Sequence, residues 1–475
     1  MRTLHDLVTD AARRYPDSFA VRDTTGSWTY AELERHSREY ASGMAAAGVA
    51  AGDRVLIRAT AERWVLAAVY ACSRLGATAV PLSPDLRDAQ REHIDADAEP
   101  ALALTGPPAG PGTTGPEPLS PGPRAPVLFF YTSGTTALPK AVVCTHQQVL
   151  FAVEAVGGRL AYRPDDVVLC RLPLSFDYGL YQAFLSAQAG ACLVLRGPGE
   201  DAGLLATIRR HGVTVVPVVP SLAGMLIKLG RRGVEDGVRL VTNTGQELTA
   251  PLLAGLRQVF PGAAVQLMYG ITECKRVTIG APDGDLARPG SLGTALPGTS
   301  VTIRDETGRP VPPGVEGEIV VSGPHLMDGY WKDPDLTAAT YRRDATTGTR
   351  QLHTGDYGHL DDEGNLYFHG RRDHMFKQRG VRTSVAEVEA AAARIPGVRE
   401  IAVLPPGPGH DAILFAVTDL EPREVIRRLL DVLEPAKAPA VCRVLDAIPL
   451  GRNGKTDRVA LHHLLEDDTA VKHHD

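Results

Sequence analysis

A stretch rich in hydroxyl groups, with a glycine and a nearby lysine, is the part of the sequence best suited to bind phosphate. It follows an apolar run, residues 127–131, that predicts a buried strand. Glycine lets the backbone turn tightly so that N–H groups converge on an anion, and hydroxyl and ammonium groups add donors and charge. A flexible Ser/Thr linker is the alternative, and the strand before and the Pro-Lys after disfavour it. The predicted phosphate loop comprises Thr132, Ser133, Gly134, Thr135, Thr136 and Lys140.

Four further motifs place charged or hydroxyl side chains after predicted strands or in turns. Thr272 and Glu273 follow a strand, where a hydroxyl beside a carboxylate could hold a phosphate and its Mg²⁺. Asp356 is predicted on a turn, where it could accept hydrogen bonds from two ribose hydroxyls. Residues 370–373 form a charged turn, and Lys455 lies in a Gly-rich loop. Taken alone, the first two of these motifs are better explained as structural turns, residues 370–373 could be merely solvated, and the Lys455 loop would be a surface loop in most proteins.

Taken together and in this order, the five motifs resemble those of the adenylate-forming superfamily, which includes acyl-CoA synthetases, adenylation domains of nonribosomal peptide synthetases and luciferases. The motifs are TSGTT-x-x-PK, YG-x-TE, TGD, GR-x-D with a following K-x-x-G, and P-x-x-x-x-GK. The resemblance runs from near residue 10 to near residue 460. It implies a two-step reaction in which a carboxylate attacks the α-phosphate of MgATP to give acyl-AMP, and a thiol then takes the acyl group.

The resemblance also implies a role for each matching residue. The phosphate loop with Lys140 would grip the β- and γ-phosphates. Lys455 would bridge the attacking carboxylate and the α-phosphate, because a cation between two anions neutralises the charge that develops there. The other implied roles are Thr272 on the α-phosphate, Glu273 on Mg²⁺, Asp356 and Arg371 at the ribose, Gly245 and Tyr269 around the adenine, Asp373 as the hinge and Gly380 at the pantetheine tunnel.

Length and composition are consistent with this class. A chain of 475 residues is too long for a single hydrophobic core, so two or more domains are expected. A content of 44% hydrophobic and 22% charged residues is typical of a globular protein. A net charge of −6 argues against a basic surface that binds nucleic acid. The six cysteines show no CxxC pair, which predicts reduced thiols in a cytoplasmic protein without structural zinc. No stretch is apolar for long enough to span a bilayer, and the N-terminus lacks an apolar signal core.

The order of predicted elements indicates an α/β fold. Helix and strand patterns alternate up to about residue 290, which predicts parallel sheets with helices on both faces. Short alternating runs between Gly/Pro turns then predict an antiparallel, barrel-like part over residues 291–371. The resemblance implies an N-terminal adenylation domain of two α/β subdomains plus this barrel, residues 1–371, and a small mobile α+β lid domain, residues 372–475. Residues 105–126 are predicted to be an exposed Pro/Gly-rich connector.

Two alanines depart from the family pattern, which usually has Gly at these positions. They are Ala137 and Ala141, on either side of Lys140. Their methyl groups restrict positive φ, so we expect a slightly altered phosphate loop.

The acid pocket is expected around Phe176, Asp177, Ser221 and Met268. The Phe176-Asp177 pair resembles amino-acid-activating domains, in which the Asp holds the substrate ammonium. A carboxylate in an apolar pocket is costly without a cation, so Asp177 is either this anchor or a solvated turn residue. Lys275 and Arg276 could balance Asp177, hold a polar substrate group or face solvent. We expect an amino acid or small polar acid rather than a long acyl chain.

The predicted function is therefore an ATP- and Mg²⁺-dependent acid-adenylating ligase that passes the acyl group to the thiol of a separate carrier-protein phosphopantetheine or of CoA. The alternative is a member with a non-thiol acceptor, such as an amine or an inorganic anion. A non-enzymatic nucleotide-binding scaffold is disfavoured because Lys140, Glu273, Asp356 and Lys455 are all present.

Overall fold

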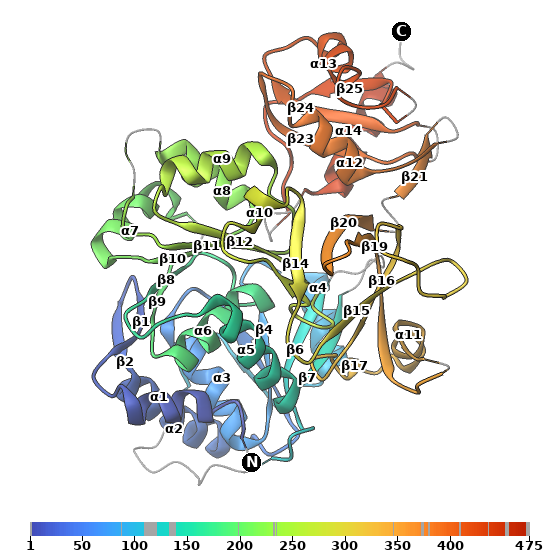
Figure 1. The fold of residues 1–475 in the computed structure, drawn as a ribbon. Helices are drawn as coiled ribbons and strands as arrows, with labels where there is room; N and C mark the ends of the chain where they lie inside the picture. The colour runs from blue at the N-terminus through green and yellow to red at the C-terminus, as the bar shows by residue number, and fades with distance from the viewer. Residues whose placement is uncertain are drawn as a thin grey trace.

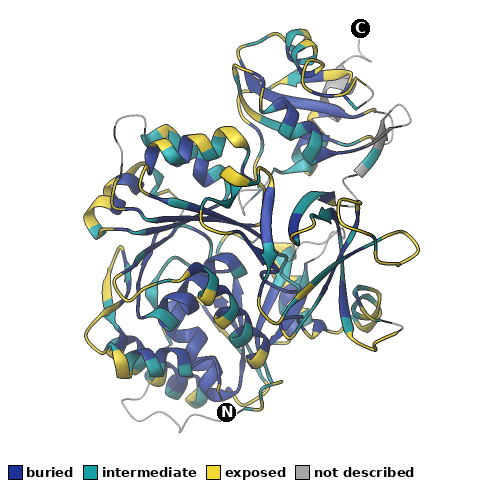
Figure 2. Ribbon diagram, viewed as in Figure 1, coloured by how far each residue is buried: buried dark blue, intermediate teal, exposed yellow. Residues whose placement is uncertain are grey.

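The computed structural model shows a large N-terminal part with a smaller C-terminal part above it (Figure 1). Figure 2 shows the buried residues concentrated in the helices and strands of the large part. The structure describes the chain apart from residues 1, 87, 109–120, 133–138, 198, 231, 232, 234, 345, 372–374, 379, 380, 408, 409, 436, 452–455 and 472–475.

The first sheet of the N-terminal part has six strands in the order β17-β7-β6-β4-β3-β5. Strands β5, β3, β4 and β6 run parallel, whereas β7 and β17 are added antiparallel at the β6 edge. The bounds are β3 (Arg54–Arg58), β4 (Thr78–Leu82), β5 (Leu102–Leu104), β6 (Pro126–Thr132), β7 (Lys140–Thr145) and β17 (Gly329–Tyr330).

The second sheet is larger, and its main path runs β15-β16-β19-β20-β14-β13-β12-β11-β10-β8-β9-β1-β2. Strands β12, β11, β10, β8, β9 and β1 are parallel to their neighbours within that run. Their bounds are β1 (Phe19–Asp23), β2 (Gly26–Thr29), β8 (Val167–Cys170), β9 (Cys192–Leu195), β10 (Val215–Val218), β11 (Leu240–Asn243) and β12 (Ala264–Tyr269).

The antiparallel strands continue the second sheet instead of forming a sheet of their own. They begin at β13, which pairs with β12, so the antiparallel part starts before the expected residue 291. The pattern of short alternating runs is otherwise as predicted. The strands are β13 (Thr278–Ile279), β14 (Ser291–Ala295), β15 (Ser300–Arg304), β16 (Gly317–Ser322), β18 (Tyr341–Arg343), β19 (Arg350–Leu360) and β20 (Asn365–Arg371).

Helices that are apolar on every side are buried between other elements, because no face of them favours water. In α3 all residues from Trp64 to Leu75 are buried, and in α6 all from Tyr178 to Ala187 (Figure 2). The helices of this part are α1 (Asp6–Arg14), α2 (Tyr30–Ala46), α3 (Arg63–Leu75), α4 (Asp88–Ala98), α5 (His146–Leu160), α6 (Asp177–Ala189), η1 (Asp201–Gly203), α7 (Leu204–His211), α8 (Pro220–Gly230), α9 (Ala250–Val259), α10 (Gly284–Ala287) and α11 (Pro334–Thr340).

The C-terminal part has its own apolar cores, one of them including Val388, Leu414 and Val425. It contacts the larger part at β20, where the Ser384 hydroxyl donates to the His369 carbonyl at 2.6 Å. Its elements are β21 (Met375–Gln378), β22 (Val381–Ser384), α12 (Val385–Ala392), β23 (Val398–Leu404), β24 (Ile413–Thr418), α13 (Pro422–Leu429), β25 (Val441–Val444) and α14 (Arg458–Val471).

Two expectations about the cysteines and the membrane can be compared with the structure. All six cysteines are buried free thiols, as predicted. Over the described residues, none of the helices combines the length and the apolar character needed to cross a bilayer.

The helix α2 begins with a capping box formed by Thr29 and Glu32. The Thr29 hydroxyl accepts from the Glu32 N–H at 3.2 Å, and the Glu32 carboxylate accepts from the Thr29 N–H at 2.8 Å. We expect Thr29→Ala to lower the free energy of unfolding by about 1 kcal/mol. Thr249→Ala is the matched control, because Thr249 is the N-cap of α9 without a side-chain capping bond. Urea unfolding followed by circular dichroism would measure both, and equal losses would contradict the assignment.

Candidate active site

Tyr269, Asp356 and Arg371, which the sequence predicts at the nucleotide, meet in the structure. The Tyr269 hydroxyl donates to Asp356 Oδ2 at 2.7 Å, and Arg371 Nε lies 3.3 Å from Asp356 Oδ1. Burial, and then the charge of Asp356, raise the pKa of Tyr269, so its phenol stays a donor. Asp356 is 3% exposed, whereas the Arg371 side chain is half-exposed. The group therefore offers carboxylate oxygens and a cation at one place, which suits a polyhydroxylated ligand.

Asp356 differs from expectation in its local structure. It was predicted on a turn, but it lies inside the eleven-residue strand β19. Gly355 has a φ of +68°, which an L side chain rarely adopts, and this kink lets the strand pass through the motif without ending. The Gly signal that predicted a turn marks an irregular strand.

Thr272 and Glu273 lie in the tight turn after β12. Gly270 starts the turn, and a Cβ there would lie 1.9 Å from the Lys275 carbonyl, so only glycine fits. Glu273 Oε1 accepts from the Tyr330 hydroxyl at 2.7 Å. Both Thr272 and Glu273 are partly exposed. A half-exposed carboxylate beside a hydroxyl is an all-oxygen donor set of the kind that Mg²⁺ takes, so these residues fit the expected cation.

The phosphate loop can be placed by its two ends. Ser133, Gly134, Thr135 and Thr136 lie outside the described residues, but Thr132 and Lys140 are paired across β6 and β7. The loop is therefore the tip of an antiparallel hairpin. At the C-terminal end of the loop, the Pro139 carbonyl lies 3.0 Å from His93 Nε2. Lys140 Nζ, one residue later, lies 3.7 Å from Asp333 Oδ2.

The expectation about Ala141 is wrong. Ala141 lies within β7, opposite Tyr131, and it does not have a positive φ. Its methyl group is buried in the sheet, so Ala141 does not restrict the phosphate loop. Ala137 lies outside the described residues.

Lys455, Asp373 and Gly380 also lie outside the described residues. The residues that flank the segment with Lys455 are described, and Leu450 and Thr456 pair in an antiparallel β-bridge. The Asp457 N–H donates to the Pro449 carbonyl at 2.8 Å. The chain on both sides of Lys455 is thus held together, and α14 starts three residues later, at Arg458.

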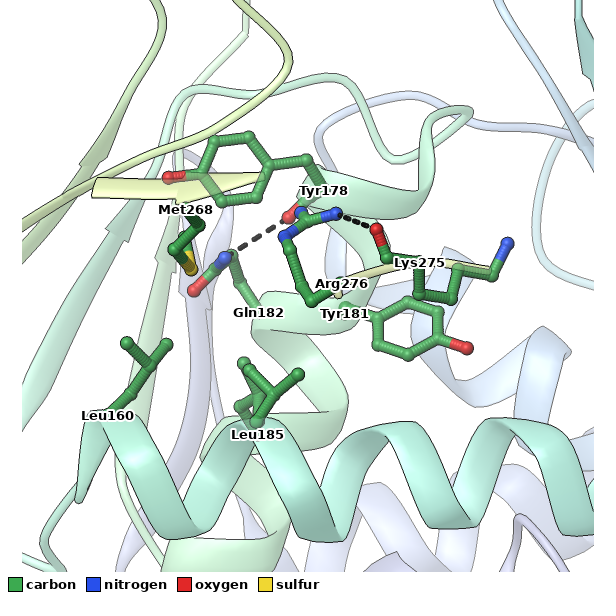
Figure 3. Close-up of a pocket in the computed structure, with 9 residues that line it drawn as sticks. Leu160, Tyr178, Tyr181, Gln182, Leu185, Met268, Lys275 and Arg276 are labelled. Carbon is green, nitrogen blue, oxygen red and sulfur yellow. Dashed lines mark hydrogen bonds between the residues drawn. The ribbon is translucent and has the colours of Figure 1, made fainter. Parts of the chain in front are cut away.

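The acid pocket contains a buried ion pair. Arg276 Nη1 lies 3.5 Å from Asp177 Oδ2, and the side chains are 8% and 13% exposed. The guanidinium also stacks 4.8 Å from the centre of the Tyr178 ring, and it donates to the Lys275 carbonyl at 3.0 Å (Figure 3). Asp177 is therefore not a solvated turn residue, and Lys275 and Arg276 do not face solvent. Of the alternatives given for the two cations, the structure shows Arg276 balancing the charge of Asp177.

A small cavity lies beside this ion pair (Figure 3). Its volume is about 10 Å³, room for about one water. The polar group of Gln182 in its wall is already satisfied, because it accepts from Tyr162 and donates to the Tyr178 carbonyl. Met268 lines the cavity as expected, whereas Phe176, Asp177 and Ser221 do not. The lining residues are Val156, Leu160, Tyr178, Tyr181, Gln182, Leu185, Met268, Lys275 and Arg276.

Lys275 supports the turn from inside the core. Its ammonium donates to the Thr272 carbonyl at 3.1 Å and lies 4.1 Å from the centre of the Phe130 ring. Because Phe130 belongs to β6, the strand that enters the phosphate loop, this contact links the two predicted phosphate-binding segments.

Sequence reasoning expects the pocket to include residues 173–179 and the helix after them, and Tyr178 and Gln182, one helical turn apart on α6, lie in this region. Sequence reasoning missed Tyr330. Tyr330 comes from a distant segment, and the sequence around it carries no signal that points to Glu273.

Comparison with known families and proteins decides the class. Residues 8–116 and 105–331 match the AMP-binding enzyme family, and residues 387–455 match the AMP-binding enzyme C-terminal domain. The chain belongs to the AMP-binding enzyme family. The predicted superfamily and the predicted class, AMP-forming acid–thiol ligases, are thereby confirmed.

Two curated relatives cover almost all of the chain. Phosphinothricin tripeptide synthetase PhsC of Streptomyces viridochromogenes is 33% identical over 97% of this chain, which spans 45% of PhsC. An L-proline--[L-prolyl-carrier protein] ligase of Pseudomonas fluorescens is 30% identical over 98% of this chain and 100% of its own length.

Two solved structures are similar as well. A complex of VinN with L-aspartate is 38% identical, with a TM-score of 0.69 over 78% of this chain and 98% of VinN. ATP-bound MatB from Rhodopseudomonas palustris is 25% identical, with a TM-score of 0.87 over 98% of this chain and 99% of MatB. The predicted α/β fold with a small C-terminal domain is thereby confirmed.

The buried ion pair allows a test of the pocket geometry. We expect Asp177→Asn and Arg276→Met each to destabilise the protein, because each leaves a buried partner uncompensated. The double variant should lose less stability than the two single variants lose together, with a coupling free energy of about 1–2 kcal/mol measured by urea unfolding. Asp419→Asn is the control, because the Arg399–Asp419 pair is exposed, and we expect no measurable change there. Strictly additive losses at 177 and 276 would contradict the pairing.

Proposed function

We propose that this protein adenylates an amino acid that carries a second carboxylate, and transfers it to the phosphopantetheine thiol of a carrier protein. The observation that carries the substrate assignment is the Asp177–Arg276 pair next to the cavity. Family membership supports the adenylation step.

The ion pair suits a substrate with charges of both signs. A buried charge is stable only with a partner, so a ligand that inserts between the two residues has to offer an ammonium to Asp177 and an anion to Arg276 in place of the pair. An amino acid with a second carboxylate provides both, and its reacting carboxyl group remains free for ATP. L-Aspartate is the ligand named for VinN, and the Pseudomonas fluorescens relative is named for an amino acid and a carrier protein.

The cavity between Leu160, Leu185 and Met268 holds only about one water, so the charges beside it, and not its volume, carry the substrate assignment. The ring of Tyr178 stacks on Arg276 at one side of this cavity (Figure 3).

ATP would bind between the phosphate loop and the Asp356 group, as the ATP-bound MatB relative supports. In this assignment Lys140 and Thr132 face the terminal phosphates, and Thr272 the α-phosphate. A Mg²⁺ ion, when bound with ATP, would neutralise phosphate charge, and Glu273 would hold it. Asp356 and Arg371 would orient the ribose, with Gly245 and Tyr269 beside the adenine.

Lys455 would approach from the C-terminal part. Because the substrate carboxylate and the α-phosphate are both anionic, a cation between them lowers the barrier to their reaction. The hinge at Asp373 would let the C-terminal part leave afterwards, so that the thiol can reach the acyl group.

A pyrophosphate-exchange assay tests the substrate assignment. We expect exchange with aspartate-like amino acids to exceed exchange with asparagine, alanine or proline by about 100-fold or more in kcat/KM, since these analogues lack the second carboxylate and leave Arg276 without a substrate partner. Arg276→Ala should abolish this preference. Equal rates for aspartate and asparagine would refute the assignment. Mass spectrometry of thioesters, with a holo carrier protein and with CoA in parallel, would decide the acceptor; acyl-AMP without either thioester would favour the non-thiol alternative.

The role of Lys455 can be tested by separating the two steps. Lys455→Ala should reduce acyl-AMP formation by about 100-fold or more, because the charge between the two anions is lost. Thiolysis of supplied acyl-AMP should change little, because the adenylate is already formed. Lys437→Ala is the control, since Lys437 pairs with Glu387 at 2.7 Å within the C-terminal part. An equal loss in both steps would remove the assigned role.

A further inference from the structure

The carboxylate of Glu273 is held by a residue that no motif includes. The Tyr330 hydroxyl donates to Glu273 Oε1 at 2.7 Å. The main-chain oxygen of Glu273 has different donors, the Met327 N–H at 2.9 Å and the Tyr341 hydroxyl at 3.1 Å. Two tyrosines therefore contact Glu273, and among the described residues the hydrogen bond to its carboxylate comes from Tyr330.

Tyr330 belongs to the short strand β17, which is fixed to β7. It lies opposite Val142 in the antiparallel pairing, and the Trp331 N–H donates to the Ala141 carbonyl at 2.9 Å. Strand β7 begins at Lys140, whose ammonium lies 3.7 Å from Asp333. A segment of only a few residues thus contacts the carboxylate after β12 and the lysine after the phosphate loop.

The hydrogen bond from Tyr330 occupies one carboxylate oxygen of Glu273, Oε1. In the described part of the chain, Oε2 has no hydrogen-bond partner, so this oxygen can face a cation.

We propose that Tyr330 is a positioning residue that orients the Glu273 carboxylate toward the divalent cation bound with ATP, and that β17 keeps this carboxylate in register with Lys140. The inference rests on the proposed function, which assigns the cation to Glu273. A carboxylate fixed by one hydrogen bond loses less rotamer freedom on binding a cation than a free one does.

The test measures metal binding without turnover. Mn²⁺ replaces Mg²⁺, ATP is present, the amino acid is omitted, and free Mn²⁺ is followed by electron paramagnetic resonance. Tyr330→Phe removes one hydroxyl, and we expect it to weaken Mn²⁺ binding in the ATP complex by about tenfold. ATP binding without metal should change less than about twofold, because Tyr330 touches no assigned nucleotide contact.

Tyr341→Phe is the matched control. It removes the same group from the same neighbourhood, but it frees the main-chain oxygen of Glu273 and not the carboxylate. We expect Mn²⁺ binding within about twofold of wild type, with thermal unfolding reporting any loss of fold. Equal weakening in Tyr330→Phe and Tyr341→Phe would overturn the proposal, because the effect would then come from the stability of the turn.

Glu273→Gln separates this proposal from the proposed function. If Glu273→Gln leaves Mn²⁺ binding unchanged, the assignment of the cation to Glu273 fails. If it weakens binding and Tyr330→Phe does not, only the role of Tyr330 fails. In the Glu273→Gln background, Tyr330→Phe should add no further loss. Should Tyr330→Phe not fold, Tyr330→His decides, since its ring N–H can donate to Oε1: near-normal Mn²⁺ binding is expected, and a loss as large as that of Glu273→Gln would overturn the proposal.

Discussion

One buried carboxylate connects the two halves of the large sheet. Asp356 lies in the antiparallel strand β19, and it accepts a hydrogen bond from Tyr269 at the end of the parallel strand β12. Because an ionised carboxylate is costly to bury without partners, the two strands must keep this contact for the fold to be stable. Arg371, at the end of β20, adds the nearby cation. The same constraint that joins parallel to antiparallel strands therefore places a carboxylate, a phenol and a guanidinium at the edge where ligands of α/β sheets bind.

The acid pocket follows the same rule with charges of both signs. Asp177 begins α6, and Arg276 follows the turn after β12, so the pair joins a buried helix to the turn that carries Thr272 and Glu273. Under the proposed function, the same pair that stabilises this region would also select the substrate, because a ligand that separates the two charges has to replace both partners.

Much of this could be predicted from the sequence, and what could not be predicted has identifiable causes. The helix starting at Tyr30, its capping box and the strand–turn units at Thr132 and Tyr269 follow from local periodicity and capping, which act over a few residues. Asp356 was misplaced because a glycine with positive φ occurs both in turns and in irregular strands. The pairing of Arg276 with Asp177 was one of three alternatives that the sequence left open. The contact of Tyr330 was not predictable, because Glu273 is 57 residues away in the sequence and only the sheet order brings the two together.

The sheet order also explains why the two phosphate-binding segments can act together. They belong to different sheets: the phosphate loop joins β6 to β7 in the six-stranded sheet, and Thr272 follows β12 in the larger one. Two separate sheets have no shared ladder to fix their relative position, so side-chain contacts must do so. Lys275 provides one, from the turn to the Phe130 ring of β6, and Tyr330 provides the other, from β17 to Glu273. These two contacts hold the turn after β12 against β6 and β17 of the six-stranded sheet, so the two predicted phosphate-binding segments keep a fixed relative position.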